Sequence, residues 1–177
     1  MRKQKQMTRK FSIAQLFLWL FVIALGIEIG AGLYETLVVM PLWDIAPPDS
    51  VRAFYQLNAA NPQFALDAGH RFWMFSTPLV GLTALATLLS GLQTRPQHRK
   101  WRIAGTILAL VVVASTFAWF VPNIIRLYGK DVMTMSDGEL TSLTNWWVRL
   151  NWVRVVLYSA GWLCALRAFS IQEREES

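Results

Sequence analysis

The chain contains four long apolar stretches, each long enough to cross a lipid bilayer as a helix. Hydropathy places them at residues 13–34, 72–92, 103–121 and 150–169. Hydrophobic residues make up 54% of the 177 positions, and no segment outside the four spans could form a second core. The sequence therefore predicts an all-α, polytopic membrane protein with one domain, a four-transmembrane-helix bundle over residues 1–177, and the lipid bilayer as its partner.

The basic residues predict the orientation of the bundle. If the N-terminus is inside, eleven of the seventeen lysines and arginines fall on the cytoplasmic side. With an even number of spans, this bias places both termini in the cytoplasm and the protein in the cell (inner) membrane. A cleavable signal peptide is the alternative for the first 32 residues, but the apolar run contains Glu28 and lacks an A-x-A site. Because the net charge of +6 divides between the two sides, we expect no nucleic-acid partner.

Two long outer loops, residues 41–71 and 122–149, are expected to carry short helical caps. A helix beginning at Asp49 or Ser50 follows two prolines in the first loop and should end at Asn61, before another proline. In the second loop, S-D-G-E fits a capping box, so the fourth helix should begin outside and continue into the membrane.

Glu28 and Glu35 lie in the first apolar stretch, seven residues apart. Seven residues at about 100° each return nearly to the starting direction, so both carboxylates share one helix face with several small residues. An ionisable side chain in hydrocarbon costs about 2.5 kcal/mol or more, so this face should pack against other helices. Gly26 and Gly30 form a G-x-x-x-G match, which indicates close helix packing.

Polar residues from all four helices converge at the outer level of the bundle. Asn151, Arg154 and Tyr158 share one face of the fourth helix at spacings of three and four. The two glutamates reach the same depth from the first helix. The remaining polar candidates at this level come from the second and third helices and are His70, Arg71, Asn123 and Arg126.

Each of these residues also has a structural interpretation. Arginines at the outer ends of spans, such as Arg126, commonly extend to lipid headgroups, and Glu35 lies near the interface. Glu28 and Arg154 lie deeper, where they form either a structural ion pair or a functional site. Most tryptophans form an interfacial belt, whereas Trp119, Trp152 and Trp162 are candidates to line an aromatic cavity.

The sequence excludes several redox classes. Cys164 is the only cysteine, so a C-x-x-C thiol oxidoreductase is ruled out. His70 and His98 are expected on opposite sides of the membrane and cannot ligate one haem. No E-x-x-H motif of a di-iron bundle occurs, so we expect no metal site and no cofactor.

The chain resembles the anthrone-oxygenase-like family of small four-span membrane proteins. The resemblance extends from about Gly26 to Phe169 and depends on four runs: G-A-G-L-Y-E, V-V-M-P-L-W, F-V-P-N-I-I-R-L and W-W-V-R-L-N-W-V-R. It implies a four-helix membrane bundle that oxidises a polycyclic aromatic with oxygen, without metal or flavin. The positions that match the family's recurrent polar and aromatic residues are Asn123, Trp147, Asn151 and Arg154. Trp152 stands where related sequences often carry histidine.

Such chemistry assigns roles to the candidate residues. Cofactor-free oxygenation needs a base, a group that stabilises an enolate, and a dry aromatic slot. Burial makes a carboxylate a stronger base and a close arginine makes it a weaker one, which favours Glu28 as base and Glu35 as the paired carboxylate. Arg154 and Asn151 would complete the catalytic set by holding the oxyanion. The predicted substrate-binding set is Glu35, His70, Trp119, Asn123, Arg126, Trp147, Trp152 and Tyr158.

A non-enzymatic function remains the competing hypothesis. The chain could be an accessory or scaffold subunit, or a proton-linked carrier of small molecules, although it shows no internal repeat. The sequence leaves the substrate open, beyond a small apolar aromatic ligand. It also leaves open whether the protein forms a homo-oligomer.

Overall fold

The computed structural model describes residues 12–61, 68–92 and 96–176. Throughout these ranges the regular structure is helical, and no strand occurs in them. Four helical segments are long and apolar enough to cross a membrane: Ile13–Leu42, Arg71–Gly91, His98–Tyr128 and Asp137–Ile171. The protein is therefore an all-α, multi-pass membrane protein, as the sequence predicts.

The first and third spans each consist of several helical pieces. The first comprises α1 (Ile13–Tyr34), η1 (Glu35–Val39) and η2 (Met40–Leu42). The third comprises α4 (Pro96–Ser115), η3 (Thr116–Phe120) and α5 (Val121–Tyr128). Both spans extend beyond the boundaries expected from hydropathy, because the helix continues past Pro41 and past Pro122, where the outer loops were expected to begin. The other two spans are α3 (Ala68–Gly91) and α6 (Asp137–Glu176).

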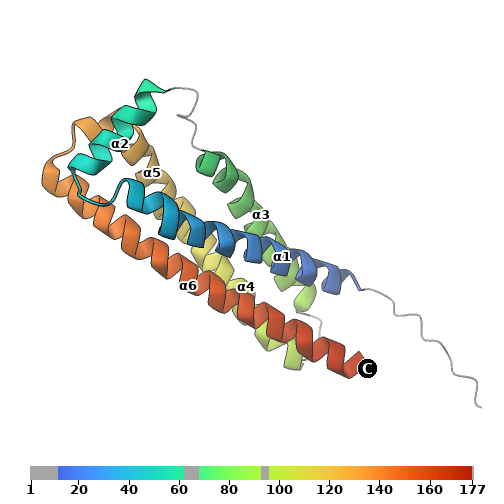
Figure 1. Cartoon of the computed structure of the whole chain (residues 1–177). Coiled ribbons are helices and arrows are strands. Elements are labelled where there is room, and N and C mark those ends of the chain that lie inside the picture. Colours follow the sequence, from blue (N-terminus) through green and yellow to red (C-terminus); the bar gives the residue numbers. More distant parts are fainter. Residues whose placement is uncertain (1–11, 62–67, 93–95, 177) are drawn as a thin grey trace, which may run out of the picture.

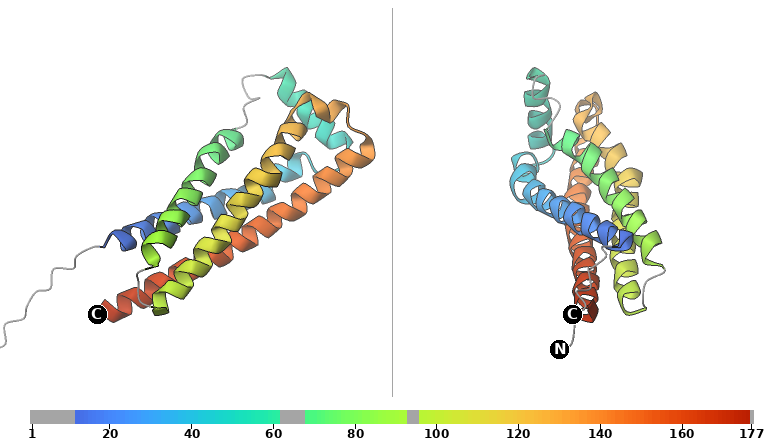
Figure 2. Two further views of the ribbon diagram at one scale, coloured as in Figure 1. Left: turned by 180° about the vertical axis from the view of Figure 1, so that it is seen from behind. Right: turned by 90° about the vertical axis from the view of Figure 1, so that its right-hand side faces the viewer.

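The four long helices run alongside one another as a bundle (Figure 1), and each packs mainly against two others, so they are arranged as a ring. Helix α1 packs against α3 and α6, and α4 packs against the same two helices from the opposite side. Helices α1 and α4 run toward the end of the bundle that carries α2 and α5, and α3 and α6 run back (Figure 2). We call this end the cap end. The beginning of α1 and the end of α6 lie together at the opposite end.

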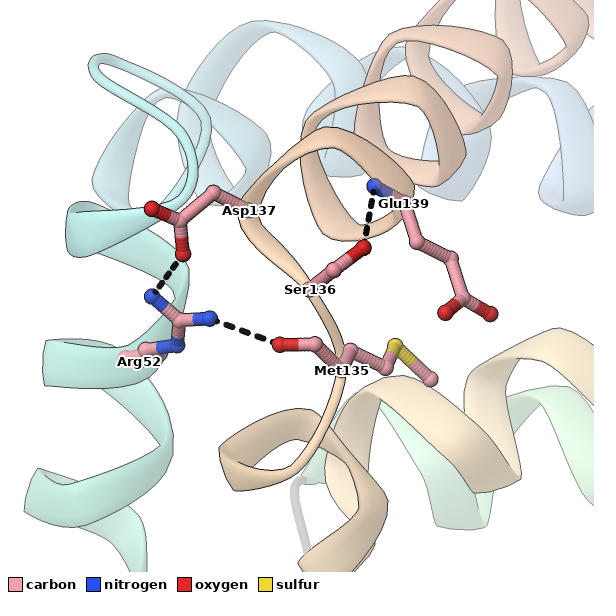
Figure 3. Close-up of polar contacts among 5 residues, drawn as sticks. All are labelled: Arg52, Met135, Ser136, Asp137 and Glu139. Carbon is pink, nitrogen blue, oxygen red and sulfur yellow. Dashed lines mark hydrogen bonds and ion pairs between the residues drawn. The ribbon is translucent and has the colours of Figure 1, made fainter.

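The cap contains two short helices, α2 (Asp49–Ala60) and η4 (Lys130–Met133). Helix α2 begins at the expected residue and is capped by Asn61, which confirms the prediction. Arg52 connects α2 to the start of α6: its Nη1 is 2.7 Å from an Asp137 carboxylate oxygen, and its Nη2 donates to the Met135 carbonyl at 2.8 Å (Figure 3). The cap and the longest span are thus joined by a charged contact.

The capping interaction predicted for α6 is present. The Ser136 hydroxyl accepts a hydrogen bond from the Glu139 backbone N–H at 3.3 Å, as Figure 3 shows. From Asp137 the helix continues without a break to Glu176. One helix therefore extends from the cap through the whole bundle.

Glycine determines where two of the helices cross. A Cβ added to Gly105 of α4 would lie 2.7 Å from the Gly161 carbonyl oxygen of α6, so only glycine permits this approach. The expected close packing at Gly26 and Gly30 is different. A Cβ on Gly30 would meet nothing within 4 Å, and Gly26 faces the Trp162 indole rather than a neighbouring backbone. The close crossing is therefore between α4 and α6.

Candidate functional site

One face of α6 supplies much of the candidate site. Trp147, Asn151, Arg154 and Tyr158 follow one another at spacings of four, three and four, and all four are buried. This spacing keeps side chains on one side of an α-helix. Asn151 is 1% exposed and Arg154 8% exposed, so the face points into the bundle.

Glu28 faces this region from α1 and is 1% exposed. Its Oε1 accepts a hydrogen bond of 2.8 Å from the Thr77 hydroxyl of α3. Its Oε2 has no hydrogen-bond partner among the described residues. Arg154 is near enough for its charge to act on this carboxyl group. One carboxylate oxygen is thus held in place and the other is available.

Asn151 joins α6 to the end of the first span. Its amide nitrogen donates to the Thr36 hydroxyl at 3.0 Å and to the Met40 sulfur at 3.1 Å. The Thr36 hydroxyl in turn donates to the Gly32 carbonyl at 2.7 Å. Both N–H groups of the amide are used, so the Asn151 nitrogen fixes the relative position of two helices.

Aromatic rings contact the Arg154 guanidinium. Its central carbon lies 4.5 Å from the Phe120 ring centroid and 5.1 Å from the Trp73 ring centroid. Trp73 belongs to α3, which stands opposite α6 in the ring of helices, so the arginine reaches across the bundle. No ion pair joins Arg154 to Glu28, although the structure describes both side chains. Cation–π contacts therefore hold the guanidinium.

Several buried polar atoms in this region have no hydrogen-bond partner among the described residues. They are Glu28 Oε2, Ser76 Oγ, Trp147 Nε1, Arg154 Nε and the Tyr158 hydroxyl. Each unpaired buried group costs about 1–3 kcal/mol, and folded proteins usually contain few of them. Such a concentration in the cap-end half of the bundle favours a site for the polar groups of a ligand.

The other predicted residues are more dispersed. Trp119 is half-buried and contacts Phe120 and Trp147. Trp152 directly follows Asn151, and the rotation of about 100° per residue in an α-helix turns it away from the buried face. It lies on the outside of α6 and is 42% exposed. It is not brought together with the buried cluster.

The polar residues at the ends of the spans have local partners. The Asn123 amide donates to the Trp119 carbonyl at 2.7 Å, one turn earlier. Arg126 forms an ion pair with Glu139 at the cap end. Glu35 is half-buried at the start of η1. The predicted His70 side chain lies outside the described residues.

Sequence reasoning missed some of the residues closest to the cluster. Thr36, Thr77, Trp73 and Phe120 are the direct partners of the predicted polar residues. Threonine and aromatic residues are common throughout the spans, so composition alone could not select these positions. Within the described residues, no group of three histidine, cysteine, aspartate or glutamate side chains is arranged to hold a metal ion.

The fold and the site define a multi-pass membrane protein with a polar and aromatic cluster enclosed by four helices. The comparison with protein families identifies the group more narrowly: residues 64–164 match the anthrone oxygenase family. The match covers more than half of the chain, so the protein belongs to this family. It includes Arg154, Asn151 and Trp73, whereas Glu28 precedes it. No curated protein and no solved structure matches the chain.

Proposed function

We propose that this protein oxidises an acidic polycyclic aromatic compound with molecular oxygen, in the cap-end half of the bundle. The observation that carries the proposal is that Glu28, Arg154 and Tyr158 are buried within range of one another's charges, beside aromatic rings. Each of them has a buried polar atom with no hydrogen-bond partner among the described residues. Membership of the anthrone oxygenase family supports the same class of reaction.

The substrate itself can supply the electrons for this reaction. An anthrone has a methylene group that loses a proton to a base, leaving an enolate that reduces oxygen. Oxygen adds to the same carbon and, once protonated, forms a hydroperoxide. Loss of water then leaves a carbonyl, so one oxygen atom enters the product and the other leaves as water.

Glu28 would be the base in this scheme. Its Oε1 is fixed by the Thr77 hydroxyl and its Oε2 has no hydrogen-bond partner in the described part of the chain, so one oxygen can accept the substrate proton. The structure has no contact ion pair between Glu28 and Arg154, which would have weakened the carboxylate as a base. The Ser76 hydroxyl lies beside the same carboxyl group and has no other hydrogen-bond partner among the described residues.

Arg154 and Tyr158 would stabilise the enolate oxygen. They are one helical turn apart on the buried face of α6, and Arg154 Nε and the Tyr158 hydroxyl can each donate a hydrogen bond. Tyr158 lies within range of the charges of both Glu28 and Arg154, so the three groups share one electrostatic environment. The amide nitrogen of Asn151 is already engaged, so we assign Asn151 a positioning role.

The proposal is tested with purified protein in lipid nanodiscs and 1,8-dihydroxyanthrone, by following oxygen uptake and quinone absorbance above the spontaneous rate. Glu28→Gln should lower kcat by about 10²-fold, the usual contribution of a general base. Arg154→Met should also lower kcat, and Glu35→Gln should have a smaller effect than Glu28→Gln. Asp131→Asn, an exposed carboxylate on η4, is the control and should leave the rate unchanged.

Metal and flavin content of the same preparation would be measured, and turnover should not depend on either. Absence of turnover with a panel of acidic polycyclic compounds would favour the accessory-protein hypothesis. Equal rates for the parent protein, Glu28→Gln and Arg154→Met would also favour the accessory-protein hypothesis.

A further inference from the structure

A surface groove lies between the third span and the cap-end half of α6. It has a volume of about 520 Å³, within the roughly 300–1,000 Å³ usual for small-molecule sites. Its apolar lining comes from Trp119, Leu143, Trp146 and Leu150, and its charged lining from Arg126 and Glu139. We call it the Trp119 groove. It opens outward beside Trp146, which is 54% exposed.

Aromatic side chains at the back of the Trp119 groove also contact the buried cluster. The Trp119 ring packs edge-to-face on Phe120, with ring centroids 4.8 Å apart, and also contacts Trp147 at 5.8 Å. Phe120 is the ring beneath the Arg154 guanidinium. One layer of aromatic side chains therefore separates the groove from the proposed reaction site.

This layer also contains a polar atom that lacks a partner. Trp147 is 3% exposed, and its Nε1 has no hydrogen-bond partner among the described residues. It stands behind Trp119 and two turns before Arg154 on the same face of α6. An N–H donor at this point suits a ligand whose oxygen atoms are attached to an otherwise apolar ring system.

We infer that the Trp119 groove is the loading site at which a flat polycyclic aromatic substrate enters from the bilayer, with Trp119 as the side chain between groove and reaction site. This inference rests on the proposed function, because it names the route to that site. The paired Arg126 and Glu139 charges suit the polar edge of the substrate, and the two indoles suit its rings. A lipid acyl chain would need neither the aromatic layer nor the unpaired indole N–H.

Binding is tested without turnover, so that the result does not depend on the oxygenase proposal. Leu143→Cys, in the Cys164→Ala background, places a thiol in the groove, and N-ethylmaleimide reports its accessibility in nanodiscs. The probe is 1,8-dihydroxyanthraquinone, which has no methylene group to oxidise. Saturating quinone should slow labelling of Leu143→Cys, whereas labelling of Val156→Cys, an exposed position on α6 outside the groove, should not change.

Kinetics test the role of Trp119. Trp119→Ala should raise KM about three- to tenfold, the range expected for losing one aromatic contact, with little change in kcat. Phe117→Ala is the matched control, because Phe117 is an exposed aromatic residue of η3 that does not line the groove. A lowered kcat with unchanged KM would place Trp119 in the reaction step and contradict the loading role.

The two proposals fail differently. Quinone protection of Leu143→Cys in a protein with no turnover would leave the groove as a ligand site and remove the oxygenase proposal. Turnover without quinone protection would overturn the loading site. Labelling of Leu143→Cys that responds to phospholipid acyl chains but not to quinone would identify the Trp119 groove as a lipid site. This result would also overturn the loading site.

Discussion

The environment of Arg154 leads to a quantitative prediction. The sequence leaves open an ion pair with Glu28, but the structure instead places the guanidinium 4.5 Å from Phe120 and 5.1 Å from Trp73. Arg154→Met keeps most of the length of the side chain and removes the charge, and Phe120→Leu removes the ring and keeps apolar bulk. A double-mutant cycle with these two changes isolates the contact. We expect a coupling of about 0.5–2 kcal/mol, the range for cation–π pairs from exposed to desolvated sites.

The same cycle with Glu28→Gln and Arg154→Met tests the ion pair directly. Breaking a buried pair in contact costs about 3–5 kcal/mol, and a pair that is not in contact should give a coupling below this range. Unfolding free energies would be measured by SDS titration of the protein in mixed micelles, followed by circular dichroism. A coupling of several kcal/mol between Glu28 and Arg154, with none between Phe120 and Arg154, would refute the conclusion that aromatic rings rather than Glu28 hold the guanidinium.

Two further predictions concern the bundle and its orientation. Gly105→Ala should lower the unfolding free energy by about 1–3 kcal/mol, because its Cβ would overlap a carbonyl of α6, whereas Gly30→Ala, which meets nothing, should be neutral or stabilising by up to about 1 kcal/mol. Equal effects in the same micelle titration would place the close helix crossing elsewhere. We also predict a cytoplasmic N-terminus from the charge bias. In a Cys164→Ala background, an impermeant maleimide added to intact cells should label Gln56→Cys but not Lys100→Cys, and the reverse pattern would invert the topology.

The fold could be predicted in detail because its causes are local in sequence. Membrane-length apolar runs determine the number of spans, and hydrogen-bonding caps determine where α2 and α6 begin. Helical periodicity also placed Asn151, Arg154 and Tyr158 together on a buried face, and the structure agrees. Trp152 was included because it is an aromatic residue within a span rather than because of its periodicity, and it lies on the outside of the helix.

The contacts within the site could not be predicted in the same way. Whether Arg154 meets Glu28 or Phe120 depends on how α6 is rotated against its neighbours, and periodicity gives no information about that rotation. The close approach of Gly105 and Gly161 likewise depends on how α4 and α6 are rotated against each other, which periodicity cannot predict. A G-x-x-x-G match on one helix cannot indicate whether a partner backbone is present, which explains why Gly30 meets nothing.

Each of the two spans that run toward the cap contains one widened helical turn, and the residues of these turns lie beside the site. In η1 and η3, hydrogen bonds run from a backbone N–H to the carbonyl five residues earlier, from Met40 to Glu35 and from Val121 to Thr116. Each turn is followed by a proline, whose missing N–H and ring make a regular turn at that point unfavourable.

The widened turns also determine which side chains reach the cluster. In a regular α-helix, a step of four residues overshoots a full turn by about 40°, so repeated steps leave the starting face. A longer turn reduces this drift between Thr36 and Met40, which keeps the two residues on one side, where both contact Asn151. The equivalent turn in the third span ends at Phe120, beside Arg154. The prolines that follow the two widened turns thus help to place a hydrogen-bonding pair and an aromatic ring against the buried face of α6.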